Sequence, residues 1–160
     1  VRIQQEVEKM AINLGERKNI TANDIETFIG ISKEYNPFEF QAALAGKNLA
    51  KALRIIQYFK EHPKAAPLVF LLTTLYSFFS KVYTLFEMQE VNMQSAMNIF
   101  YRNPVSSKQA LQAYENYGFK GIEKILLLLH QYNLRTIGVN DASYEDESLL
   151  KEMTVKIICC

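Results

Sequence analysis

The sequence contains no tryptophan and only two cysteines, Cys159 and Cys160, which are adjacent at the end of the chain. Two adjacent cysteines cannot cross-link a domain, so they indicate a reducing, cytoplasmic compartment and thiols without a structural role. A zinc site is not indicated either, because zinc requires four ligands and neither His62 nor His130 lies near the cysteines in the sequence. We therefore expect no metal-binding residue and no cofactor.

Motifs that carry catalytic chemistry are also missing. The chain has no GxxxxGK(S/T) or GxGxxG phosphate loop, no HExxH helix and no GxSxG nucleophile motif. The acidic run Glu145–Glu147 stands at an expected helix start, where the helix dipole favours negative charge. We prefer that structural role to a metal-binding or acid–base role. The sequence thus predicts no catalytic residue and a chain that is not an enzyme.

A general excess of positive charge is absent, since the formal net charge is +1. One local basic stripe remains: Lys47, Lys51 and Arg54 are spaced to share a helix face, and Lys60 and Lys64 continue the trend. These cations could contact a phosphate backbone, or they could form the solvated face of an ordinary amphipathic helix. The absence of tryptophan argues against a base-stacking platform.

The residues that are present favour an all-α domain. Among 160 residues 49% are apolar, they recur at helical spacing nearly throughout, and we find neither strand alternation nor a hairpin signal. About nine helices are expected, which means a helical bundle. The expected boundaries are a start at Asn36-Pro37, an end at Gly46, breaks at His62-Pro63 and Asn103-Pro104, a cap at Ser106 or Ser107, and an end at Gly118.

Two of the expected helices are apolar nearly all round, one from Pro67 to about Glu87 and one from Ile122 to about Ile137. Helices of that kind lie centrally in a bundle. The uncharged run from Leu68 to Ser80 is shorter than the roughly 20 residues of a membrane span, so we expect a buried core helix and no membrane contact.

One stretch resembles a known family. Ile20–Ile29 is followed by Ser32–Leu44 and then by Gly46–Ile56, and together they resemble the delta subunits of the bacterial DNA polymerase III clamp loader. Weaker similarity continues to Ile137. The chain departs from the family pattern at Glu39 and Gln41, where the family has aspartates. The most specific residues, to which we assign a structural role, are Tyr35, Asn36, Pro37, Phe38, Phe40 and Leu44.

The resemblance implies a non-catalytic subunit of the DNA polymerase III holoenzyme, which acts in DNA replication. The clamp loader uses ATP bound on sister subunits to open the sliding clamp and place it on primed DNA. Residues 1–34 would be the end of a helical AAA+ lid, and residues 36–160 the collar, a helical oligomerisation domain. The collar would bind the ATP-binding and delta-prime type subunits. The sliding clamp would be bound by an N-terminal AAA+-like domain that is absent from this chain.

A collar works through surface area, and such interfaces are enriched in aromatic anchors. The candidate anchors are the exposed members among Tyr76, Phe79, Tyr83, Phe86, Tyr114 and Tyr117, all of which could instead be core residues. Two other functions stay open. The chain could be a stand-alone helical nucleic-acid-binding domain, or a ligand-binding or enzymatic bundle with a polar pocket.

Overall fold

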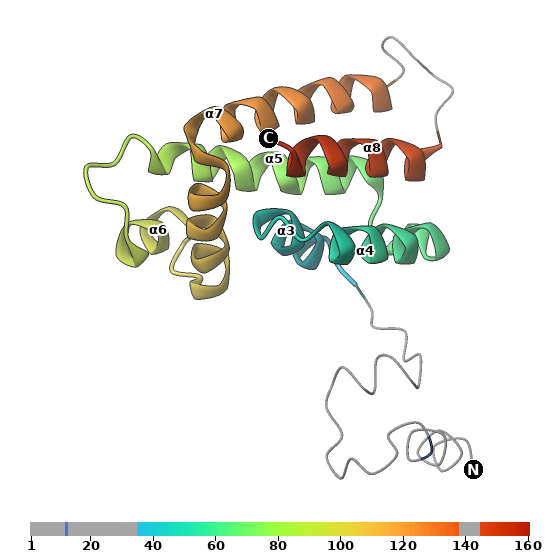
Figure 1. Cartoon of the computed structure of the whole chain (residues 1–160), viewed down its shortest axis with the longest axis horizontal. Coiled ribbons are helices and arrows are strands. Elements are labelled where there is room, and N and C mark those ends of the chain that lie inside the picture. The colour runs from blue at the N-terminus through green and yellow to red at the C-terminus, as the bar shows by residue number, and fades with distance from the viewer. Residues whose placement is uncertain (1–11, 13–34, 138–144) are drawn as a thin grey trace. The chain divides into compact units, whose positions relative to one another are not determined.

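A computed structural model describes Ile12, residues 35–137 and residues 145–160 of the chain. The chain divides between Glu34 and Tyr35 into two units, and the second unit, Tyr35–Cys160, holds all the described residues except Ile12. The described residues of this unit form six α-helices and a short 3₁₀ helix, with no strand among them (Figure 1). The α-helices are α3 (Pro37–Ala45), α4 (Leu49–Glu61), α5 (Leu68–Leu85), α6 (Met93–Ile99), α7 (Pro104–Thr136) and α8 (Asp146–Ile158), and the 3₁₀ helix is η1 (Pro63–Ala65).

The predicted all-α bundle is therefore confirmed for the part of the chain that the structure describes. The helices expected before Tyr35, and the lid assignment of residues 1–34, lie outside the described residues and stay predictions. The described part of the last helix begins at Asp146, with Glu145 at its N-cap position.

Asn36 starts α3 in the way that the sequence predicts. Its side-chain oxygen accepts hydrogen bonds from the backbone N–H groups of Phe38, at 2.9 Å, and Glu39, at 3.1 Å. Pro37 occupies the first helical position, where a missing N–H costs nothing. Asn48 caps α4 in the same manner, by accepting from the Lys51 N–H at 2.9 Å. Two asparagine caps thus define a tight α3–α4 hairpin.

Helix α5 differs from the expectation of a fully buried central helix. Its inner face is in the core, with Leu71, Leu75 and Phe79 inaccessible to solvent. Its outer face is exposed although it is apolar, and Phe70 and Tyr76 are each about half exposed there. The reason is that α7, α3 and α6 are the helices that pack against α5, and the outer face lies where none of them packs.

By length and composition alone, the helical stretch Pro63–Leu85 is also the one stretch among the described residues that could cross a membrane. Core helices of soluble proteins meet the same criterion, and eight α5 residues are buried in this bundle. The stretch is therefore weak evidence for a membrane span.

The cap of α7 is Asn103 and not Ser106 or Ser107, so that prediction is wrong. The Asn103 side chain accepts from the N–H groups of Val105, at 3.0 Å, and Ser106, at 3.1 Å. Pro104 takes the first helical position, as Pro37 does in α3. The Ser107 hydroxyl is buried and donates to the Asn103 carbonyl at 2.7 Å.

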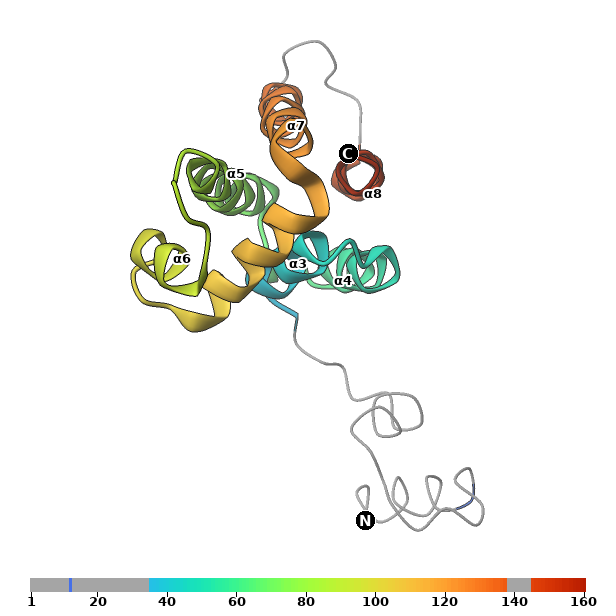
Figure 2. The ribbon, with the colours of Figure 1, turned by 60° about the vertical axis from the view of Figure 1, so that its left-hand side comes forward.

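Gly118 divides α7 into two arms, residues 104–117 and 119–136. Its backbone, at φ 62° and ψ 178°, is in a region essentially restricted to glycine, and the chain changes direction sharply there (Figure 2). The sequence predicts a helix end at this residue, and the break confirms it. The first arm packs beside α6 and α3, whereas the second runs along α5 (Figures 1 and 2).

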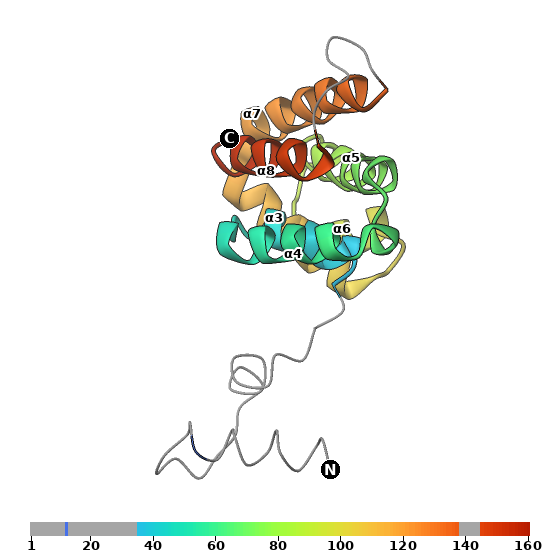
Figure 3. The ribbon, with the colours of Figure 1, turned by 90° about the vertical axis from the view of Figure 1, so that its right-hand side faces the viewer.

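Helix α8 closes the bundle by packing against α4, the second arm of α7 and α3 (Figure 3). Its apolar residues Leu149, Leu150, Met153 and Ile157 are all buried. Where it ends, the Cys160 carbonyl approaches Gly121, and an added Cβ at that glycine would lie 3.4 Å from the carbonyl oxygen. One apolar core therefore joins all six described α-helices.

We predict that Gly118→Ala destabilises the protein by about 1–3 kcal/mol, because alanine must adopt the strained backbone of the bend. The matched control is Gly46→Ala, where φ is −88° and an added Cβ meets mainly the flexible Gln112 side chain. Urea unfolding monitored by circular dichroism measures both variants. If the two variants lose equal stability, or if Gly118→Ala loses none, the bend does not depend on glycine.

Candidate functional site

The family-signature residues build the α3 hairpin and do not gather into a polar site. Phe40 and Leu44 are inaccessible to solvent, and Tyr35 meets the Tyr58 ring edge-on at 5.6 Å. The Leu44 carbonyl accepts a 2.6 Å hydrogen bond from the buried Tyr117 hydroxyl, whose pKa is raised by burial. Phe38 is the exception, because it lies on the surface. The structural role assigned to the signature residues stays a prediction.

Most of the candidate interface aromatics pack against one another around the α7 bend. Phe86 stacks on Tyr114, with ring centroids 4.2 Å apart, and meets Phe119 edge-on at 5.6 Å. Phe79 meets Tyr117 edge-on at 6.0 Å. We call this group the bend cluster; it comprises Phe79, Tyr83, Phe86, Tyr114, Tyr117 and Phe119.

The bend cluster therefore shows which of the candidate aromatics are core residues and which one is exposed. Phe79 and Tyr117 are buried, and Tyr83, Phe86 and Tyr114 are half-buried against the core. Their role is to hold α5 to the bend of α7. Tyr76 alone among the six candidates is exposed.

Tyr76 belongs to an exposed apolar surface along α5 and the second arm of α7. It lines a hollow of about 240 Å³ together with Leu72, Leu129 and His130. Leu127 lies one turn before His130 on the same side of α7 and is 59% exposed. Val69 lies two turns before Tyr76 on α5 and is also exposed. We call this surface the α5–α7 face; it comprises Val69, Tyr76, Leu127 and His130.

No charged residue lines the hollow of the α5–α7 face, although its lining includes the polar side chains of Thr73, His130 and Asn133. The Thr73 hydroxyl already has a partner, because it donates to the Val69 carbonyl at 2.8 Å. His130 is exposed and lines the hollow. A surface of this kind favours contact with another apolar surface.

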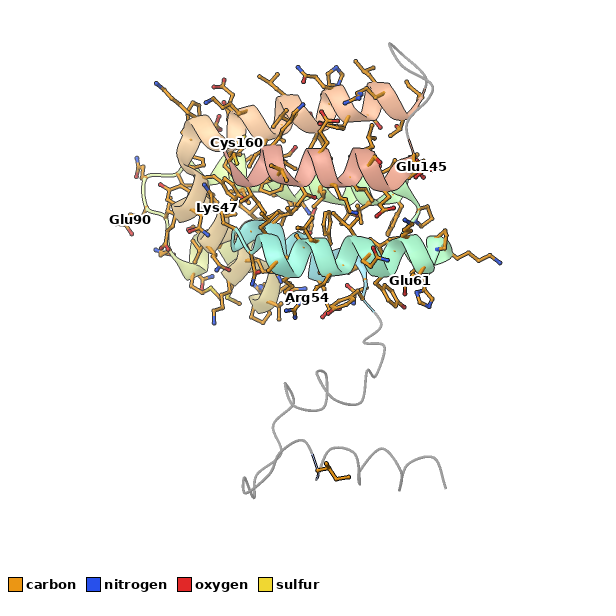
Figure 4. The ribbon with its side chains drawn as sticks, turned by 45° about the vertical axis from the view of Figure 1, so that its right-hand side comes forward. Lys47, Arg54, Glu61, Glu90, Glu145 and Cys160 are labelled. Carbon is orange, nitrogen blue, oxygen red and sulfur yellow. The ribbon has the colours of Figure 1, made fainter. Side chains whose placement is uncertain are left out.

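The basic stripe predicted at Lys47, Lys51 and Arg54 is not one continuous helix face. Lys47 lies in the turn before α4, with φ 50°, and its ammonium stands 4.5 Å from the centroid of the Tyr117 ring. Lys51 and Arg54 lie on α4, and Arg54 points away from the bundle (Figure 4). The stripe does not extend as expected either, because Lys60 is paired with an acidic residue of α8.

That acidic residue is Glu147, which links α4 to α8. One carboxylate oxygen lies 2.6 Å from the Lys60 ammonium, and the other lies 2.5 Å from the Lys151 ammonium. Hydrogen bonds from Lys151 and Lys60 hold the pKa of Glu147 below its usual value. Asp146 and Glu147 occupy the first turn of α8, which confirms the structural interpretation of the acidic run.

Glu152 forms a second bridge one turn and a half further along α8. It contacts Lys156 at 2.6 Å and Arg135 of α7 at 3.3 Å. Bonding to Lys156 and Tyr132 lowers the pKa of Glu152. The two glutamates thus fasten α8 to α4 on one side and to α7 on the other.

The remaining reactive groups of the described residues do not converge. Cys159 and Cys160 are free thiols, and burial raises the pKa of Cys160. His62 stacks on Tyr58 with ring centroids 4.3 Å apart, far in sequence from the cysteines. Within residues 35–137 and 145–160 no group of three or more histidine, cysteine, aspartate or glutamate side chains could hold a metal ion.

Comparisons with family models, with curated proteins and with solved structures give no significant match to this chain. The resemblance to clamp-loader delta subunits therefore rests on the sequence pattern and stays a prediction.

We predict that Glu147→Gln lowers the stability of the protein at pH 7 and that its difference from the unsubstituted chain disappears in acid. The folded pKa of Glu147 is depressed below its ordinary value of 4.5, so the stabilisation is present above that pH and is lost as the pH falls through the depressed pKa. Urea midpoints between pH 7 and pH 3 measure this effect.

The control is Glu145→Gln, since Glu145 is exposed at the N-cap position and forms no ion pair with the described residues. A stability difference for Glu147→Gln that does not change with pH would contradict the proposed charge effect.

Proposed function

We propose that this chain is a non-catalytic assembly module that binds partner protein subunits, and that it acts as the collar of a clamp-loader delta subunit. The observation that carries the proposal is the α5–α7 face, an exposed apolar surface on a rigid helical bundle. Removing such a surface from water stabilises an interface by roughly 25 cal/mol per Å² of apolar area.

The composition of the α5–α7 face supports this role. Tyrosine is enriched and charge is depleted at the centres of protein–protein interfaces, and here Tyr76 stands on a helix with no charged residue from Leu68 to Ser80. Leu127 supplies a second exposed anchor from α7. Both helices are held by the bend cluster, so the surface does not need to be ordered on binding, which favours affinity.

The partner class that we propose comes from the resemblance of the sequence to clamp-loader delta subunits. The α3 hairpin that Tyr35 to Leu44 form is the segment most like the clamp-loader delta family, in which the collar joins the ATP-binding and delta-prime type subunits. In this proposal the module holds the pentamer together, while the complete subunit opens the sliding clamp and loads it on primed DNA. The parent would then be a non-catalytic subunit of the DNA polymerase III holoenzyme.

Nucleic-acid binding by the isolated chain is the weaker alternative. Of the five cations in the expected stripe, Lys47 is placed over the Tyr117 ring and Lys60 is neutralised by Glu147. The remaining cations provide few phosphate contacts, and affinity for nucleic acid grows with the number of such contacts. A gel-shift assay with labelled DNA at low salt distinguishes the two functions.

We predict that the whole chain is captured by the ATP-binding and delta-prime type clamp-loader subunits of the same organism, and that Leu127→Asp and Tyr76→Asp each weaken capture about tenfold or more. The physical reason is that an aspartate buried in an apolar interface loses its hydration. Pull-down of the purified subunits followed by titration measures the effect, with sliding clamp in a parallel tube as a protein that this chain should not bind.

The matched control is Val155→Asp, because Val155 is an apolar α8 residue that is 44% exposed away from the α5–α7 face. Circular dichroism shows whether each variant is folded. If the folded chain is captured by none of the subunits, or if all three variants bind equally, the collar proposal fails.

A further inference from the structure

A second surface lies next to the α5–α7 face, further round α5. It is a groove of about 340 Å³ between α3, α5 and the turn from α6 to α7, and Thr73 separates it from the α5–α7 face. We call it the α3–α5 groove. Its main lining residues are Phe38, Phe70, Phe78, Phe100, Lys81 and Ser106.

The floor of the α3–α5 groove is mainly aromatic; Ser77 and Ser106 also line the groove, and two of its other polar side chains already have partners. The Thr74 hydroxyl donates to the Phe70 carbonyl at 2.9 Å, and the Gln41 amide donates to Gln109 at 2.8 Å. Phe38 and Phe70 are both more than half exposed at the rim. The groove therefore offers phenylalanine rings with few free hydrogen-bonding groups, and an occupant must bring apolar side chains.

Charge in the α3–α5 groove is of one sign. Lys81 is its only charged lining residue, and no carboxylate among the described residues forms an ion pair with it. The Lys81 ammonium is instead directed at aromatic rings, 5.7 Å from the Phe100 centroid and 4.7 Å from the Tyr101 centroid. An occupant with a carboxylate near Lys81 would thus complete a charge pair at the edge of an apolar site.

The turn beside Lys81 is held in an unfavourable backbone conformation. Tyr101 and Arg102 are consecutive non-glycine residues with φ of 53° and 60°, and bulky residues seldom adopt this left-handed region. Tyr101 is 83% exposed, so burial of its ring does not explain the strain. Strain of this kind concentrates at binding sites. Here it accompanies an exposed aromatic ring, Tyr101, that lies beside Lys81.

We propose that the α3–α5 groove binds a short amphipathic, acidic peptide segment of a partner protein. Apolar side chains of the segment occupy the phenylalanine floor, and a carboxylate of the segment pairs with Lys81. A helix laid into an apolar groove is a common form of peptide recognition. A nucleic-acid strand fits less well, because a single lysine provides few phosphate contacts and the floor has few hydrogen-bonding groups. This inference goes beyond the proposed function and does not depend on it.

The test begins with the immobilised whole chain and a display library of random peptides of about 15 residues. Selected peptides are expected to combine leucine or phenylalanine at helical spacing with aspartate or glutamate. One selected peptide is then synthesised with a fluorescent label, and its affinity is measured by fluorescence polarisation.

Lys81→Glu and Phe70→Ser are each expected to weaken this peptide about tenfold or more. Lys51→Glu, at a half-buried position, and Val155→Ser, at an exposed one, lie on other helices and are expected to leave its affinity unchanged. A peptide whose acidic residues are replaced by lysine should bind Lys81→Glu better than it binds the unsubstituted chain. The melting temperature of each variant shows that its fold is retained.

Four outcomes would overturn the proposal. The library selection enriches no peptide, or the selected peptide binds Lys81→Glu and Phe70→Ser as well as the unsubstituted chain. The third outcome is that a labelled oligo-dT strand binds the chain and that Tyr101→Ala abolishes this binding, which would assign the surface to nucleic acid. The fourth outcome is that light scattering finds a dimer and that Phe70→Ser converts it to a monomer, which would mean that a second copy of the chain occupies the groove.

Discussion

The bend at Gly118 is the constraint on which the described bundle depends. Because the residue has no Cβ, the chain can leave the helical path between two arms of one long helix. Asn116 and Tyr117, just before the bend, bond to the carbonyls of Ala45 and Leu44 in α3. Phe119, just after it, packs on Tyr83 and Phe86 of α5. A straight helix could not make both sets of contacts.

The same arrangement explains why α5 has two kinds of surface. The bend places the second arm of α7 along one side of α5 and leaves α3 and α6 on another, so the inner face is buried and the outer face is not (Figure 2). An apolar helix that would otherwise be an ordinary core element therefore contributes Tyr76 to one surface and Phe70 to another. Both surfaces rest on a rigid support, and that is an advantage in binding since little conformational freedom is lost.

Much of the fold follows from local chemistry that can be recognised in the sequence. Asn36-Pro37 starts a helix because the asparagine caps it and the proline needs no partner at that position. Gly46 and Gly118 mark ends because the chain must leave the helix there. The Asn103 cap is harder to single out, since two serines nearby have the same capping ability. The acidic run Glu145–Glu147 indicates a helix start correctly, but its partner Lys60 is 87 positions away from Glu147 (147 − 60) and cannot be inferred from spacing.

The two exposed surfaces show most clearly what the sequence alone does not predict. Helical periodicity and caps act over a few residues, so the sequence alone establishes that the described chain is helical and where α3, α4, α5 and α8 lie. The packing of the helices is needed to show that Tyr114 and Phe86 stack on each other while Tyr76 and Leu127 stay exposed. It is also needed to show that Lys47 and Lys60 are engaged while Lys81 has no carboxylate partner among the described residues. The physical reason is that burial and charge pairing depend on which distant helices meet, and here that depends on the direction the chain takes at Gly118.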